Sequence, residues 1–138
     1  MTQLTYYRIL VTGSRRFTDV QALEAALLDV WHDVTQFGGQ MLVVHGECYP
    51  PPDRSGQRPY RSADWLTHLW CTTHGVQDEP HPADWHTHGR AAGPIRNAEM
   101  VALGAHLCLA APLGASTGTR DCTRRAHAAG IPVHEVTA

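Results

Sequence analysis

Short apolar runs alternate along the chain with longer segments in which apolar residues recur at helical spacing. Residues 7–12 (YRILVT), 41–46 (MLVVHG) and 106–112 (HLCLAAP) are short and rich in β-branched and aliphatic side chains. This composition predicts buried strands. A short strand is also expected near Val76, and a last one over residues 132–136.

Other segments show the spacing of amphipathic helices. Helices are predicted from Thr18 or Asp19 to about Val34, over residues 62–75, from Pro94 onward and over residues 117–129. Thr18 and Asp19 are both suitable N-terminal caps, and Gly75 is the expected end of the second helix. Pro94 fits a first helical turn, because an N–H group has no helical partner there. Residues 80–92, which precede it, are predicted to be a polar loop.

Alternation of strands with helices is typical of a parallel sheet that is covered on both faces. We therefore expect a Rossmann-like three-layer α/β/α sandwich with a mainly parallel sheet. The 138 residues form a single domain in this prediction, because 43% hydrophobic residues suffice for one core. Residues 48–61 are rich in Pro and Gly and are interpreted as an insertion, which is either a disordered connection or a lid or partner surface.

Charge and cysteine content narrow the possible functions. The formal net charge of -2 lacks the positive field on which non-specific nucleic-acid binding relies, so no nucleic-acid partner is expected. The four cysteines form no C-x-x-C pair, which is unlike a disulfide scaffold or a zinc ribbon and predicts reduced thiols. The first residues carry only a short apolar run, so no signal peptide and no membrane span are expected and the protein is placed in the cytoplasm.

Polar loops lie at the edge where a parallel sheet binds its ligands. Four loops converge on one crevice in this topology: TGSRRF after the first strand, HGECYPPPDRSGQRPYRSAD after the second, HPADWHTHGRAAGPIRN before the helix at Pro94, and PLGASTGT after the strand at 106–112. The last two loops open helices, whose first N–H groups and dipole favour an anion. These helix starts predict a phosphate site and hence a nucleotide-like ligand.

Groups at three of these turns are expected to hold the phosphate. Gly13 either lets the backbone approach phosphate or belongs to an ordinary turn, while Ser14 donates a hydrogen bond and Arg15 contacts two oxygens. The predicted nucleotide-binding set further includes Gly46, Gly93, Arg96, Ser116, Thr117, Gly118 and Thr119.

Other candidates concern the ribose and the base. Asn97 is suited to a ribose hydroxyl or a base edge. Asp64 is either a ribose ligand or an acid matched to the dipole of its helix, and Trp85 is either a stacking wall for a base or an anchor of its loop. Arg96 and Glu99 either serve the site or form a surface ion pair.

Six blocks of the sequence together resemble the small SLOG-superfamily proteins related to YspA and YpsA, which are common in actinobacteria and their phages. The blocks are VTGSRRFTD (11–19), SADWLTHLW (62–70), HPADW (81–85), AGPIRNAEMV (92–101), STGTRDC (116–122) and AGIPVHEV (129–136). The resemblance implies a Rossmann-like domain that binds nucleotides or ADP-ribose-like molecules. Its relatives include the Lonely Guy phosphoribohydrolases, which remove a base from a nucleoside monophosphate.

The comparison with the Lonely Guy enzymes favours binding over hydrolysis. Matches to their R-K-x-x-M block are Arg96, Asn97 (in place of Lys) and Met100, and matches to their P-G-G-x-G-T-x-x-E block are Gly118 and Thr119. Cys122 occupies the position of the catalytic Glu. A thiol of ordinary pKa cannot stabilise an oxocarbenium-like centre as a carboxylate does, so the resemblance implies a ligand-binding protein more than an enzyme.

The expected function is binding of a phosphate-bearing nucleotide or ADP-ribose-like molecule, as a sensor or as a sequestering protein. A phage origin would suit sequestration of a host immune signal. The alternative is a nucleoside-monophosphate phosphoribohydrolase, in which Arg96 acts with Glu99 or Glu47.

No cofactor and no metal are expected. His81, His86 and His88 form an H-x-H cluster, but its third ligand and supporting contacts are not identified in the sequence. A homo-oligomer is expected to form through exposed apolar helix residues such as Trp65, Leu66 and Leu69.

Overall fold

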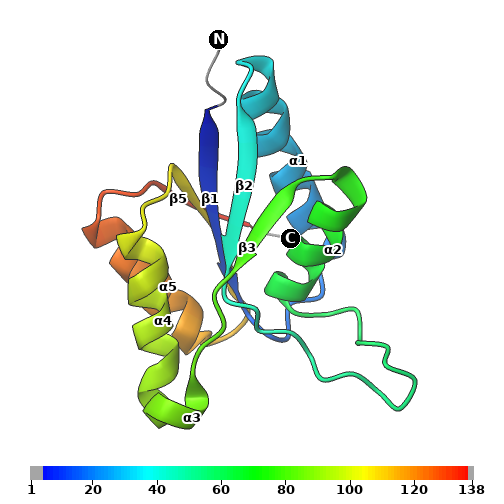
Figure 1. The fold of residues 1–138 in the computed structure, drawn as a ribbon, viewed down its shortest axis with the longest axis vertical. Coiled ribbons are helices and arrows are strands. Elements are labelled where there is room, and N and C mark those ends of the chain that lie inside the picture. Colours follow the sequence, from blue (N-terminus) through cyan, green and yellow to red (C-terminus); the bar gives the residue numbers. More distant parts are fainter. Residues whose placement is uncertain (1–4, 137–138) are drawn as a thin grey trace.

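The computed structural model describes residues 5–136 as a sheet with helices on both faces (Figure 1). The strands are β1 (Tyr6–Gly13), β2 (Gln40–His45), β3 (Gln77–Pro80), β4 (Leu107–Ala111) and β5 (Val133–Glu135). The helices are α1 (Val20–Gln36), α2 (Ala63–His74), α3 (Trp85–His88), α4 (Ala92–Ala102) and α5 (Thr117–Ala128), with a 3-10 turn η1 (Gly89–Ala91).

The described strands form one parallel sheet in the order β3-β2-β1-β4-β5. Ile9 in the central strand lies opposite Val43 on one side and Leu107 on the other. Helices α1 and α2 cover one face and α4 and α5 cover the other (Figure 1). The Rossmann-like α/β/α prediction is therefore confirmed. The strand order reverses between β1 and β4, and ligands bind outside the carboxyl ends of such a switch point.

Each face of the sheet has its own apolar cluster, because successive strand side chains point to opposite faces. Ile9 and Val11 of β1 pack with Leu23, Leu27 and Trp70 on the side of α1 and α2. The residue between them, Leu10, packs instead with Met100, Cys108 and Cys122 on the side of α4 and α5. Both faces of β1 are thus buried, which explains its uninterrupted apolar sequence.

Helix ends follow the predicted caps. Asp19 caps α1 by accepting a hydrogen bond from the Ala22 N–H group, and Gly75 ends α2 in the left-handed conformation. The segment predicted as a polar loop over 80–92 is an exception, since it contains α3 and η1. The Asp84 side chain caps α3. A helix of one turn is too short to show a helical period, so the pattern could not indicate it.

Residues 48–61, here called the arm, contain no helix or strand and project from the body (Figure 1). The guanidinium of Arg58 donates to the Pro50 carbonyl and lies over the rings of Tyr49 and Trp65. At the tip, the Asp53 carboxylate accepts hydrogen bonds from Ser55 and Gln57. The arm is therefore joined to α2 at its base, while its tip is stabilised by contacts of its own.

Candidate functional site

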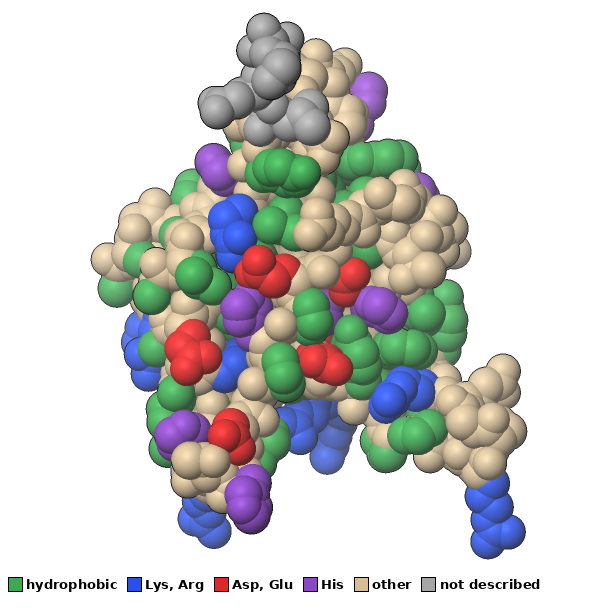
Figure 2. Space-filling model, in the orientation of Figure 1, with side chains coloured by type: hydrophobic (Ala, Val, Ile, Leu, Met, Phe, Trp, Pro, Cys, Tyr) green, Lys and Arg blue, Asp and Glu red, His purple; other side chains and the backbone are tan. Residues whose placement is uncertain are grey.

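A pocket of about 590 Å³ lies at the carboxyl ends of β1, β2 and β4. Most of the predicted binding residues line it: Gly13, Ser14, Arg15, Gly46, Asp64, Trp85, Arg96, Asn97, Ser116, Gly118 and Thr119. Figure 2 shows basic side chains set back between the α3 lobe and the arm, at the lower edge of the molecule. Three polar loops and the start of α5 therefore meet at one place, as parallel-strand topology predicts.

The start of α5 faces this pocket with backbone N–H groups that no side chain caps. Ser116 precedes the helix in the left-handed conformation (φ 42°), and its hydroxyl is bonded to the N–H and C=O groups of Leu113 instead. Gly118 and Thr119 line the pocket, whereas Thr117 does not. An uncapped helix start carries partial positive charge and unpaired donors, which suits an anionic group.

Arg96 is only 9% exposed and holds two loops together. Its Nη1 donates to the Gly46 carbonyl at 2.7 Å and to the His81 carbonyl at 3.3 Å, and its Nε donates to Oδ1 of Asn97 at 2.9 Å. Nη2 contacts only the Cys48 sulfur, at 3.7 Å. One edge of the guanidinium therefore remains for a ligand, while the other is committed to the fold.

Two sequence interpretations change once these contacts are included. Both N–H groups of the Asn97 amide are engaged, since its Nδ2 donates to the Gly118 carbonyl and to Asp121. Arg96 is not paired with Glu99, which is exposed and outside the pocket. Asn97 is therefore better described as a brace between α4 and α5 than as a free ribose or base ligand.

Glycines of the site are needed mainly for packing. A Cβ on Gly13 would lie 2.8 Å from the Ala111 carbonyl and would overlap Ala63. A Cβ on Gly46 would overlap the guanidinium of Arg96. Gly93 is buried outside the pocket, and a Cβ there would touch the Trp85 ring at 3.5 Å. Gly13 and Gly46 therefore let neighbouring elements approach, whereas a Cβ at Gly93 would make ordinary contact only. For Gly13, the sequence offered approach of the backbone to phosphate or an ordinary turn, and both stay open.

Arg15 and Trp85 form the outer wall of the pocket. Trp85 is 49% exposed, and the guanidinium carbon of Arg15 lies 5.6 Å from its ring centre. Arg15 and the neighbouring Arg16 are both exposed. An indole with a cation beside it offers a planar base both a stacking surface and positive charge. This placement favours the stacking-wall interpretation of Trp85.

Ser14 is fixed by its backbone. Its N–H donates to the Ala111 carbonyl at 3.0 Å, its carbonyl accepts from Ala63, and its hydroxyl oxygen accepts from the Arg16 N–H. The hydroxyl hydrogen is left to donate into the pocket.

Asp64 is the one carboxylate among the described residues that lines the pocket. It accepts a hydrogen bond from the Cys48 N–H at 3.0 Å and is 5% exposed. Glu47 and Glu99, the acids proposed to replace the missing Glu, both lie outside the pocket. Asp64 therefore combines a structural contact with a position at the site.

The thiols near the site are poorly suited to acid–base or nucleophilic chemistry. Burial raises the pKa of the Cys122 thiol to about 11. Burial, with the Asp64 charge second, also raises the pKa of Cys48, which lines the pocket. A thiol with a raised pKa is protonated at neutral pH and is a poor nucleophile. Cys122 is buried among apolar side chains outside the pocket and cannot act as the missing Glu.

Several pocket residues were missed by sequence reasoning. They are Val11, Thr12, Arg16, Cys48, Met100, Leu113, Gly114 and Ala115. Arg16 was within reach, because it belongs to the same TGSRRF loop as Arg15. Leu113, Gly114 and Ala115 belong to the PLGASTGT loop that the sequence placed at the crevice, whereas Val11 and Met100 come from a strand and a helix.

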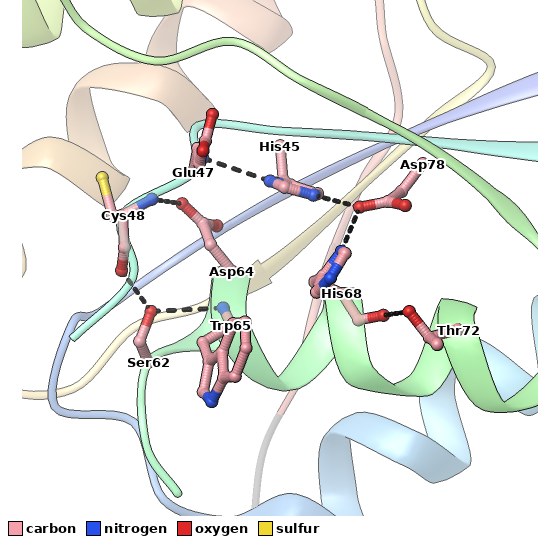
Figure 3. A network of polar contacts seen from close by, with 9 residues as sticks. All are labelled: His45, Glu47, Cys48, Ser62, Asp64, Trp65, His68, Thr72 and Asp78. Atoms are coloured by element: carbon pink, nitrogen blue, oxygen red, sulfur yellow. Dashed lines mark hydrogen bonds and ion pairs between the residues drawn. The ribbon is translucent and has the colours of Figure 1, made fainter. Parts of the chain in front are cut away.

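A second polar network lies next to the pocket, around Asp78 (Figure 3). Nε2 of His45 and Nδ1 of His68 lie 2.7 and 2.8 Å from the same Asp78 oxygen. Burial disfavours the charged carboxylate, but hydrogen bonds from His45 and His68 outweigh it and hold the pKa of Asp78 below its ordinary value of 3.8. We call these three residues the His–Asp–His cluster.

Histidines that the sequence singled out behave differently. His81 is bonded to Glu79 at 2.7 Å, while His86 and His88 lie exposed on α3. The His–Asp–His cluster was missed because its members come from β2, α2 and β3, far apart in sequence. No local spacing could indicate it.

The apolar residues proposed as an oligomer interface are largely covered. Leu66 is buried in the core, and Trp65 is half-buried beneath Tyr49 and Arg58. Leu69 is also half-buried. Leu66 is not available for an interface because it packs in the core, and the arm covers part of Trp65. A homo-oligomer itself stays a prediction.

Within residues 5–136, no helix combines the length and the apolar character that crossing a membrane requires.

Together, the parallel sheet, the strand order and the pocket at the carboxyl ends define a Rossmann-like α/β protein. The chain is similar to the Gene 61 protein of Mycobacterium phage D29, with 42% identity over 131 residues, which cover 91% of this chain and 93% of the phage protein. It therefore belongs to the family of this phage protein. No protein-family model and no solved structure matches the chain.

Proposed function

We propose that the protein binds a phosphate-bearing nucleotide or an ADP-ribose-like molecule in the pocket, as a sensor or a sequestering protein. One observation carries this proposal: the uncapped start of α5, Arg15 and Trp85 all line the same cavity. The start of α5 and Arg15 suit phosphate, and Trp85 suits a base. The resemblance to SLOG proteins points to the same ligand class.

The size of the pocket supports a ligand of this kind. A volume of about 590 Å³ falls within the range of about 300–1,000 Å³ that is usual for small-molecule sites. In the proposed pose the phosphate lies against Gly118 and Thr119, the base stacks on Trp85, and the ribose lies near Asp64. The similarity to a phage protein is compatible with sequestration of a host nucleotide signal.

A leucine at position 118 tests this pose without disturbing the protein. A Cβ built on Gly118 meets no atom within 4 Å, although the residue lines the pocket. Gly118→Leu is therefore expected to fill the phosphate position, and its Cβ meets open space. The matched control is Thr117→Leu, which adds a similar side chain one residue earlier, outside the pocket.

The measurement is isothermal titration with nucleoside monophosphates, NAD and ADP-ribose, together with mass spectrometry of molecules released on denaturing the purified protein. We expect binding to wild type and to Thr117→Leu, and at least tenfold weaker binding to Gly118→Leu. Equal affinity in all three proteins would exclude the start of α5 as the phosphate site. No bound or titratable nucleotide would overturn the proposed function.

A phosphoribohydrolase is the second candidate, and the position of Asp64 favours it. This carboxylate lines the pocket together with Arg96, and no other described acid does so. In such an enzyme, Asp64 takes the role of the missing Glu and stabilises the positive charge that develops at the ribose. Accumulation of free base from a nucleoside monophosphate, abolished by Asp64→Asn, would support it. Intact nucleotide after long incubation would exclude it.

A further inference from the structure

We propose that His45, His68 and Asp78 form a binding site for a divalent transition-metal ion of the zinc class. One ligand atom from each residue lies within 4.8 Å of the others. The side chains converge from three different elements, β2, α2 and β3 (Figure 3). This site is separate from the nucleotide pocket and does not depend on the function proposed above.

The donor set selects the class of ion. Two imidazole nitrogens and one carboxylate oxygen suit zinc and its first-row neighbours, whereas magnesium and calcium prefer oxygen ligands. The burial of the site is graded. The His45 side chain is fully buried, Asp78 is 17% exposed and His68 is 35% exposed. An ion can therefore enter from the His68 side, and three protein ligands leave a fourth position for water.

Rotation of the three side chains would bring their ligand atoms to the spacing that the ion requires. Tetrahedral ligands about 2.0–2.1 Å from zinc lie about 3.3 Å from one another. The two nitrogens now lie 2.7 and 2.8 Å from the Asp78 oxygen. Each hydrogen bond would have to open by about 0.6 Å, and the two nitrogens, which lie within 4.8 Å of one another, would have to close to about 3.3 Å, so both imidazoles must turn toward the ion.

The protons that now join the cluster need places to go. His68 can move its proton from Nδ1 to the outward Nε2. Nδ1 of His45 accepts a hydrogen bond from the Glu47 N–H at 3.1 Å, so Nε2 carries the proton. Binding of the ion at Nε2 moves this proton to Nδ1 and breaks the bond to Glu47. Both imidazoles stay neutral, but the Nδ1–H of His45 then faces the Glu47 N–H group, so two donors lose their acceptor. This loss weakens binding by about a hundredfold, which three coordination bonds outweigh.

Trp65 provides a reporter for the site. Its ring is stacked on the ring of His68, with centres 5.5 Å apart and planes at 23°. An ion held by His68 is therefore expected to change the fluorescence of Trp65. Comparison with Trp65→Phe separates this signal from those of the other tryptophans.

The experiment titrates chelator-treated protein with Zn²⁺ by calorimetry and with Co²⁺ by absorption and fluorescence. We expect one ion per chain in the wild type. Binding should weaken at least a hundredfold in His68→Ala and in Asp78→Asn. The matched control is the double variant His86→Ala with His88→Ala, which removes exposed histidines of α3 and should bind as wild type does.

Circular dichroism checks that each variant is folded. His68→Ala is expected to disturb the fold least, because His68 is partly exposed. Absence of binding in the wild type, or equal binding in His68→Ala, would overturn the proposal. The proposal would also be overturned if the α3 double variant lost ion binding while His68→Ala and Asp78→Asn kept it. Gly118→Leu should bind the ion normally, so failure of the nucleotide proposal leaves this test unaffected.

Discussion

The pocket and the His–Asp–His cluster are neighbours, yet their polar groups are used in opposite ways. In the pocket, donors at the start of α5 and on Arg15 lie beside open space without a hydrogen-bond partner among residues 5–136. In the cluster, each nitrogen that faces Asp78 is hydrogen-bonded to it. Unpaired donors around a cavity indicate a site for an anion. Where every donor already has an acceptor, as in the cluster, a metal ion can bind only if the protons of the hydrogen bonds move elsewhere.

The two regions are joined by three consecutive residues. The Gly46 carbonyl accepts from Arg96, the Glu47 N–H donates to His45, and the Cys48 N–H donates to Asp64. This short segment after β2 therefore has one contact in the cluster and two at the pocket. A substitution in either region is therefore expected to disturb the contacts of the other.

The largest expected effect comes from removing the shared acceptor of the cluster. Asp78→Ala leaves the N–H groups of His45 and His68 without their carboxylate, and His45 is fully buried. Because two hydrogen bonds to a charged group are lost, we expect a loss of about 3 kcal/mol in the free energy of unfolding. Urea unfolding measures it.

The control for this change lies on the next residue of the same strand. Glu79→Ala removes the partner of Arg8 and His81, but this carboxylate is 36% exposed. We expect a loss of about 1 kcal/mol, because water replaces part of the lost contacts. Equal losses in Asp78→Ala and Glu79→Ala would show that the cluster is not a special support of the fold.

The next effect separates the two uses of Arg96. The sequence places this residue at the ligand, and the structure adds contacts to Gly46, His81 and Asn97. Arg96→Ala should therefore weaken nucleotide binding and also lower the free energy of unfolding by about 2 kcal/mol, since buried carbonyls lose their donor. Thermal and urea unfolding beside calorimetry measure both. A variant as stable as wild type would mean that these bonds contribute little.

Arg15 and Trp85 should affect binding with little effect on stability. Both residues are substantially exposed, and Arg15 makes its contact through the ring of Trp85. In Arg15→Ala and in Trp85→Ala we expect about tenfold weaker nucleotide binding, while unfolding free energies stay within about 0.5 kcal/mol of wild type. Leu103→Ala, an exposed apolar residue outside the pocket, is the control. Unchanged affinity in both variants would remove the outer wall from the proposed site.

The smallest effect is a change in acid sensitivity. The folded-state pKa of Asp78 lies below its ordinary value of 3.8, so its ionised form stabilises the fold above that pH. This contribution is lost as pH falls from 3.8 through the lower folded-state value. Stability of wild type should therefore fall more steeply than that of Asp78→Ala over this acid range. Parallel curves in acid urea titrations would contradict the assignment.

Much of the fold could be predicted from local sequence. Buried strands such as 7–12 follow from apolar runs, and Asp19 and Gly75 follow from the chemistry of helix ends. Most of the predicted binding residues do line the pocket, because topology places the ends of parallel strands together. The short helix α3 could not, since it spans a single turn.

Whether a polar side chain is free to bind a ligand could not be predicted in the same way. Asn97 and Arg96 have the right chemistry for a nucleotide, but their partners come from Gly118, Asp121 and Gly46, which are distant in the chain. A polar side chain that suits a ligand by its chemistry can have its hydrogen-bonding groups occupied by other residues in the fold. The number of remaining donors depends on these tertiary contacts.

The sequence by itself determined the parallel α/β architecture and the edge of the sheet where polar loops gather, because periodicity and helix capping act over a few residues. Only the tertiary structure decided which donors stay free, that the arm covers Trp65, and that His45, His68 and Asp78 meet. Those outcomes depend on side chains from separate elements approaching within a few ångströms. Spacing along one chain does not encode that distance.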